Sequence, residues 1–101
     1  MQTYKIKIYK NALQDIQEAT DWYNKQLPGL GKRFQNQVKK QINSLKTTAN
    51  HHSIRYSDVR CSLVKNFPFL IHYILNKNEV EVFAVIHTSR NPKIWENIRK
   101  S

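Results

Sequence analysis

The chain has little of what stabilises secreted domains or anchors proteins in membranes. A single cysteine, Cys61, among 101 residues excludes an internal disulfide and every zinc site that needs several cysteines. No apolar run approaches the roughly 20 residues that span a bilayer, and residues 1–10 lack the apolar segment of an export signal. Repeats and low-complexity tracts are also absent. We therefore expect one domain, residues 1–101, in the reducing environment of the cytoplasm.

Acidic residues are scarce as well. Seven Asp and Glu face 17 Lys and Arg, which gives a net charge of +10, yet 40% of the residues are hydrophobic and can form a core. Between Trp22 and Asn78 the only acid is Asp58. This asymmetry favours an anionic partner, either nucleic acid or an acidic protein. The alternative is a charged surface that only keeps the protein in solution.

Hydrophobic spacing predicts one strand and two helices in the first half of the chain. Tyr4, Ile6 and Ile8 alternate with polar residues, as in a half-buried strand. Asn11, with Gln14 three residues later, is the expected cap of a helix over about residues 12–26. Its other faces carry acidic residues, and its apolar stripe consists of Leu13, Ile16, Ala19, Tyr23 and Leu27. After a turn at Pro28-Gly29, a second and basic helix runs from Leu30 to about Lys46 through Phe34, Val38, Ile42 and Leu45. The short turn predicts an antiparallel helical hairpin.

Three strand patterns follow, from Ile54 to Val64, Phe67 to Leu75 and Val80 to His87. Their short links predict antiparallel neighbours, with a tight turn at residues 76–78. The last strand is almost wholly apolar, as expected for a strand covered on both faces. Pro92 to Arg99 has the spacing of a short helix. The fold predicted is an α+β sandwich in the order β-α-α-β-β-β(-α), with the helical hairpin packed on a small antiparallel sheet.

Two candidate catalytic residues, His87 and Arg90, lie at the exit of the last long strand, and a third, Arg60, is expected on a neighbouring strand. His87 can move a proton near neutral pH, and Arg60 and Arg90 can brace a phosphate with paired hydrogen bonds. Together they would suit cleavage of RNA by its own 2′-hydroxyl. The alternative is that these side chains serve packing or solubility. The pair His51-His52 has no third ligand nearby, so we expect neither a metal nor a cofactor. His72 fits a sheet residue and Cys61 a buried thiol.

Taken together, these motifs resemble one family. They are Trp22-Tyr23, Pro28-Gly29-Leu30-Gly31, Arg33-Phe34, Val59-Arg60, Phe67-Pro68-Phe69, Ile71 with Tyr73, the run from Val82 to His87, Arg90-Asn91-Pro92 and Trp95. In this order the chain resembles the RelE/ParE superfamily of toxins from type II toxin-antitoxin systems.

The resemblance implies a bacterial growth inhibitor that is neutralised by an acidic antitoxin. The candidate antitoxin- or target-binding residues are Lys32, Arg33, Lys39, Lys40, Arg55, Lys65 and Trp95. An exposed edge of the sheet is a candidate pairing site for an antitoxin strand or for a second copy.

Two activities occur in the superfamily. ParE-like members poison DNA gyrase, whereas RelE-like members cut mRNA on the ribosome without a metal. The nucleases typically end in a catalytic Tyr or His, but the late aromatic residue here is Trp95, whose side chain cannot transfer a proton. We therefore favour the ParE branch. There are two alternatives. One is an mRNA endonuclease that uses Arg60, His87 and Arg90, and the other is a non-toxic copy that only binds partners.

Overall fold

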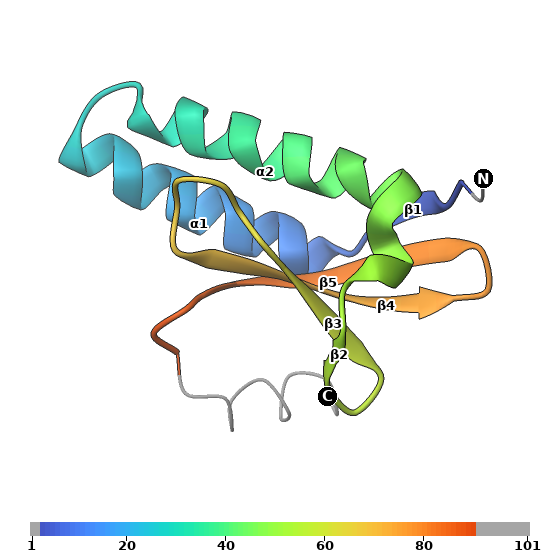
Figure 1. The fold of residues 1–101 in the computed structure, drawn as a ribbon. Helices are drawn as coiled ribbons and strands as arrows, with labels where there is room; N and C mark the ends of the chain where they lie inside the picture. Colours follow the sequence, from blue (N-terminus) through green and yellow to red (C-terminus); the bar gives the residue numbers. More distant parts are fainter. Residues whose placement is uncertain (1–2, 91–101) are drawn as a thin grey trace.

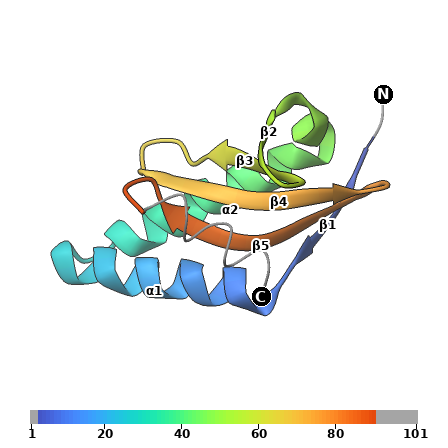
Figure 2. The same cartoon turned by 90° about the horizontal axis from the view of Figure 1, so that it is seen from below.

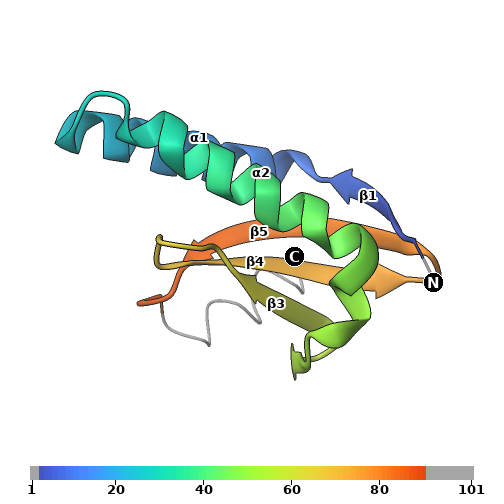
Figure 3. The same cartoon turned by 45° about the horizontal axis from the view of Figure 1, so that its top comes forward.

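A computed structural model of the chain describes residues 3–90 (Figure 1). Its elements are β1 (Lys5–Ile8), α1 (Lys10–Gln26), α2 (Leu30–Thr48), the short 3-10 helix η1 (Ala49–His51), β2 (Ile54–Tyr56), β3 (Val59–Leu63), β4 (Phe69–Asn76) and β5 (Glu79–His87). The helices lie together on one face of a five-stranded sheet (Figures 1 and 3). The predicted α+β architecture is therefore confirmed. The helix expected from Pro92 to Arg99 lies outside the described residues.

The sheet has the order β1-β5-β4-β3-β2 and is mixed, so the prediction of a purely antiparallel sheet was wrong for one pair. The consecutive strands β2 to β5 are antiparallel because short turns join them, but β1 runs parallel to β5. The chain from α1 to β4 separates β1 from β5, and a connection of that length allows parallel pairing. In Figure 2, α1 lies beside β5 and the β2–β3 hairpin lies on the side of the sheet away from α1.

The helical hairpin closes tightly at two glycines. Gly29 adopts a left-handed φ of 91° in the turn, which a residue with a Cβ adopts only at a cost. At Gly31 a Cβ would lie 2.4 Å from the carbonyl oxygen of Thr20. The Gly31 N–H also donates a 2.8 Å hydrogen bond to Oδ1 of Asn24. At this point the backbone of α2 thus contacts a side chain of α1.

The first helix begins earlier than predicted, at Lys10, so Asn11 lies inside it and is not its cap. The N–H of Tyr9 donates to the carbonyl oxygen of Val82 at 2.9 Å, and the N–H of Leu13 reaches back to Tyr9. Strand β1 therefore leads directly into the helix. Ala12 is fully buried, whereas Leu13 is 53% exposed, contrary to its place in the predicted core stripe. Leu27 is also exposed, because it follows the helix at the hairpin turn.

Two other boundaries differ from the sequence pattern. The strand expected from Ile54 to Val64 is a hairpin of β2 and β3, since Ser57 turns the chain with a φ of 47°. Helix α2 continues past Lys46 to Thr48 and into η1. The predicted turn at residues 76–78 is confirmed, because Asn76 pairs with Glu79.

Apolar side chains pack on both faces of the sheet. The larger cluster lies between helices and sheet, and it includes Phe34, Val38, Leu45, Ile71, Tyr73, Val80 and Val82. The rings of Tyr23, Phe34, Phe67 and Phe69 pack against one another at one end of it, mostly edge to face, with centroids 5.0 to 6.1 Å apart. The opposite face carries a smaller cluster of Val59, Cys61, Leu70, Ala84 and Ile86. Strand β5 contributes to both clusters, as its apolar run predicted.

Candidate functional site

Helix α2 presents a row of cations to solvent. Its apolar stripe is buried against the sheet, which leaves the basic residues exposed: Lys32, Arg33, Lys39, Lys40 and Lys46. Because Lys32, Lys39 and Lys46 are spaced by seven residues, they lie along nearly the same side of the helix. This helix therefore groups four of the predicted antitoxin- or target-binding residues on one element.

The other predicted binding residues lie elsewhere. Arg55 is exposed on β2, and its charge helps to lower the pKa of His72 on the sheet face away from the helices, although burial is the larger cause. Lys65 is exposed just after β3. Trp95 lies outside the described residues. The basic candidates thus occupy at least two separate surfaces.

The three catalytic candidates do not come together. Arg60 is half-buried and donates from Nη1 to the carbonyl oxygen of His52 at 2.5 Å, which ties β3 to the segment after η1. Arg60 pairs with Tyr73, and His87 pairs with Phe69. Arg60 and His87 are therefore about 13 Å apart along β4, at roughly 3.3 Å per residue, and on opposite sides of that strand.

His87 and Arg90 instead lie at a pocket of about 480 Å³ between α1 and the ends of β4 and β5. Nδ1 of His87 accepts hydrogen bonds from the Ser89 N–H at 3.0 Å, and the imidazole lies edge-on to the ring of Phe69. The pocket is lined by Asp15, Glu18, Ala19, Trp22, Tyr23, Pro68, Phe69, Val85, Ile86, His87 and Arg90. Two carboxylates and two basic groups thus share this pocket.

Asp15 has a structural partner in that pocket. Its Oδ2 accepts a 3.0 Å hydrogen bond from the N–H of Val85, which joins α1 to β5. Burial raises the pKa of Asp15, while the Val85 N–H and the charge of Arg90 oppose that shift. Because carboxylates repel a phosphate, this pocket is poorly suited to an RNA backbone.

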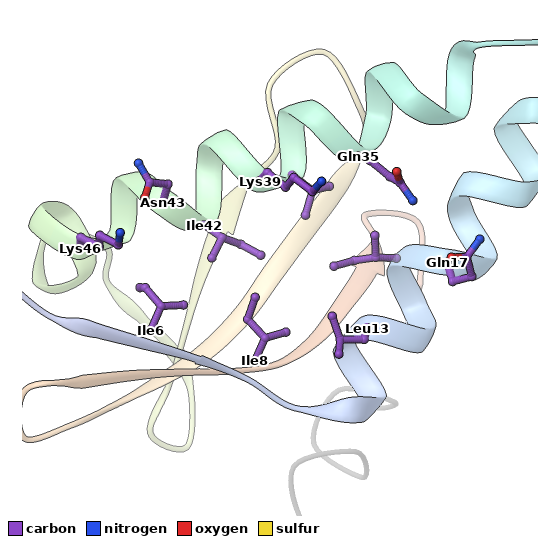
Figure 4. A pocket seen from close by; sticks show the side chains of 11 residues that line it. Ile6, Ile8, Leu13, Gln17, Gln35, Lys39, Ile42, Asn43 and Lys46 are labelled. Carbon is purple, nitrogen blue, oxygen red and sulfur yellow. The ribbon is translucent and has the colours of Figure 1, made fainter.

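A second hollow lies between β1, the start of α1, and α2 (Figure 4). This volume of about 460 Å³ is called the β1 groove below. Its floor is apolar: Ile6, Ile8, Leu13, Ile16, Val38 and Ile42. Its rim is polar or basic: Gln17, Gln35, Lys39, Asn43 and Lys46. None of these lining residues is acidic.

The sequence patterns did not predict the β1 groove. Leu13 fits a helical core stripe, and Ile6 and Ile8 fit the inner face of a half-buried strand, so all three were expected in the core. In the structure Leu13 is 53% exposed and the two isoleucines are only partly buried. The gap arises because the helices do not cover the outermost strand completely. The spacing of apolar residues along the chain does not predict how completely a strand is covered.

The sheet face away from the helices holds a buried polar group. Nδ1 of His72 lies 2.9 Å from the Tyr56 hydroxyl and 3.6 Å from Sγ of Cys61. Burial lowers the pKa of His72 to about 4 and raises the pKa of the Cys61 thiol to about 11. The predictions of a sheet histidine and a buried thiol are both confirmed.

Two kinds of feature are absent from residues 3–90. These residues contain no group of three His, Cys, Asp or Glu side chains arranged to hold a metal ion. No helix among them is long and apolar enough to cross a membrane.

Comparisons with known proteins agree with the fold. The family model described as "ParE toxin of type II toxin-antitoxin system, parDE" matches residues 6–92. A solved structure described as "Chromosomal ParDE TA system from P. aeruginosa" superposes with a TM-score of 0.77 and 18% sequence identity, over 86% of this chain and 98% of that chain. At 18% identity this similarity shows a shared fold only. No curated protein sequence matches the chain.

Proposed function

Because the chain belongs to the ParE toxin family of type II toxin-antitoxin systems, we propose that it arrests growth by inhibiting DNA gyrase and that an acidic antitoxin neutralises it. The family supports an antitoxin partner. The net charge of +10 and the cations of α2 make an acidic partner electrostatically favourable.

The separation of Arg60 from His87 is the observation that favours gyrase over RNA cleavage as the target. Cleavage through the 2′-hydroxyl needs a base, an acid and positive charge within hydrogen-bond reach of one phosphate. Arg60 holds the segment after η1, and His87 lies in a pocket that also contains Asp15 and Glu18. A single phosphate cannot contact both groups in this arrangement.

The test measures supercoiling of relaxed plasmid by purified gyrase as the full-length chain is added. We expect loss of supercoiling or accumulation of cleaved DNA, and no effect at a stoichiometric excess would overturn the proposal. His87→Gln should retain the inhibition, because the imidazole has no catalytic task in this mechanism.

Expression in growing cells separates the alternatives. Cleavage within codons of translated messages, abolished by His87→Gln, would establish the mRNA endonuclease instead. Unimpaired growth at high expression without an antitoxin would establish a non-toxic binding protein.

A further inference from the structure

Helix α2 exposes one long face that carries neither an acidic nor an apolar side chain. Its apolar stripe is buried in the core, and Gly31 lies against α1. The residues of α2 that remain exposed form the α2 cationic face: Lys32, Arg33, Asn36, Lys39, Lys40, Asn43, Lys46 and Thr47. Since residues 22–57 contain no Asp or Glu at all, no neighbour along this part of the chain neutralises the face.

The cations of this face stand in two rows with amides between them. At about 100° per residue, Asn36 and Asn43 lie near the middle of the face. A row of cations runs along each side of these amides: Lys32, Lys39 and Lys46 on one side, and Arg33 and Lys40 on the other. Figure 4 shows Lys39, Asn43 and Lys46 following one another along α2 at the rim of the β1 groove. At roughly 1.5 Å per residue the longer row extends over about 21 Å.

These dimensions match the major groove of B-DNA. An α-helix with its side chains is about 10 to 12 Å wide, and the major groove is about 12 Å wide. A helix in that groove would place one row of cations beside each phosphate backbone. Its central amides would face the base edges, where Asn can pair with adenine. Lys39 and Lys40, although adjacent in the sequence, would thus contact opposite backbones.

The same face is poorly suited to a protein partner. The centres of protein interfaces are depleted in Lys and depend on aromatic or aliphatic anchors, and the α2 cationic face offers none. The exposed Trp22 belongs to α1 and lines the pocket beside β4 and β5, together with Asp15 and Glu18. No residue of α2 lines that pocket. The anchor and the two carboxylates therefore lie apart from the cations of α2.

We propose that the α2 cationic face binds double-stranded B-DNA, with α2 in the major groove and its two rows of cations on the two phosphate backbones. This activity goes beyond gyrase inhibition and does not depend on it. Duplex RNA does not fit, because its major groove is too deep and narrow to admit these side chains. An acidic protein attracted by charge alone is the competing partner.

The first experiment measures binding of the full-length chain to a labelled duplex of about 20 base pairs, by fluorescence anisotropy at 50 and 200 mM salt. Each phosphate contact adds about 0.9 to the slope of log affinity against log salt, so five contacts predict a loss of about 500-fold over this range. Lys39→Gln with Lys40→Gln removes one contact to each backbone and should reduce that loss to about 40-fold.

The matched control is Lys5→Gln with Lys7→Gln, which makes the same change in net charge. Both lysines are exposed on β1, whereas Ile6 and Ile8 of that strand pack against the core cluster beneath the helices. Because side chains of a strand alternate between faces, the two lysines lie on the sheet face away from α2. The control pair should therefore keep the loss of about 500-fold.

The second experiment identifies the groove. A duplex whose cytosines carry a glucosylated hydroxymethyl group has sugars in its major groove and should lose binding. Netropsin, which occupies the minor groove, should leave binding to the unmodified duplex unchanged. A duplex RNA of the same sequence should bind at least tenfold more weakly than the DNA.

Three results would overturn the proposal. The same change in salt dependence for both lysine pairs would indicate attraction by net charge alone. Undiminished binding to the glucosylated duplex, or equal binding of duplex RNA, would place α2 outside the major groove. Displacement of the DNA by poly-glutamate of equal charge, as readily as by unlabelled duplex, would indicate an acidic protein partner. No gyrase is present in these assays, so DNA binding and gyrase inhibition succeed or fail separately.

Discussion

The buried imidazole of His72 should make the stability of this protein sensitive to mild acid. His72 is fully buried beside Tyr56 and Cys61, and burial lowers its pKa from 6.5 to about 4. Since the folded state binds the proton less tightly than the unfolded state, the neutral imidazole contributes to the free energy of unfolding. This contribution is complete above pH 6.5 and is lost as the pH falls toward 4. The substitution that removes it is His72→Asn, which keeps an acceptor near the position of Nδ1 and does not titrate.

The magnitude follows from the two pKa values. Each tenfold difference in proton affinity is worth about 1.36 kcal/mol, so the gap between 6.5 and about 4 corresponds to roughly 3 kcal/mol in total. About 2.5 kcal/mol of this should be lost between pH 7 and pH 4.5. The raised pKa of Asp15 stabilises the folded state as the pH falls, which opposes the effect of His72. Asp15 is present in wild type and in His72→Asn, so its effect cancels in the difference between them.

Urea denaturation at pH 7.0, 6.0, 5.0 and 4.5 measures the free energy of unfolding of wild type and His72→Asn. The variant should be less stable at pH 7 but should lose about 2.5 kcal/mol less than wild type on acidification. The control is His51→Asn, which replaces an exposed histidine of η1. Parallel losses in wild type and His72→Asn would refute the assignment of this acid sensitivity to His72.

Two further predictions concern packing. Gly31→Ala should lower the free energy of unfolding by about 1 to 2 kcal/mol in urea, because the clash with Thr20 and Asn24 outweighs the gain in helix propensity. Gly29→Asn should lower the free energy of unfolding by less, because this position lies in open space and has a left-handed φ that Asn tolerates. A larger loss for Gly29→Asn than for Gly31→Ala would contradict the predicted clash at Gly31. At pH 8 a thiol reagent should label native Cys61 about a hundredfold more slowly than the urea-unfolded chain, since burial raises its pKa from 9.0 to about 11. Similar rates in both states would contradict a buried thiol.

Local patterns predicted most of the elements because their information is carried by neighbouring residues. The stripe from Phe34 to Leu45 faces the sheet as its 3.6-residue spacing requires, and the apolar run in β5 is buried. Errors arose where another part of the chain decides the outcome. Leu13 fits its stripe but lies at a margin that the packed helices leave open, and β1 reaches the sheet only by pairing with the last strand.

The candidate site was predicted less completely than the fold. The cations of α2 follow from the sequence, because exposed positions on one amphipathic helix can be counted. Arg60 and His87 were expected to form one cluster because Arg60 was placed on a strand next to the one that ends at His87. The register through Tyr73 and Phe69 places them on opposite sides of β4.

Residue identity and spacing alone determined the charge balance, the types of the elements and the contrast between an acidic and a basic helix. None of these properties depends on contacts between distant parts of the chain. Which side chains meet was decided by strand order, register and the incomplete cover of β1, all of which join residues far apart in the chain. The β1 groove shows the difference clearly. Its lysines and isoleucines are visible in the sequence, but they become one basic-rimmed apolar surface only when α2 packs above the edge of the sheet.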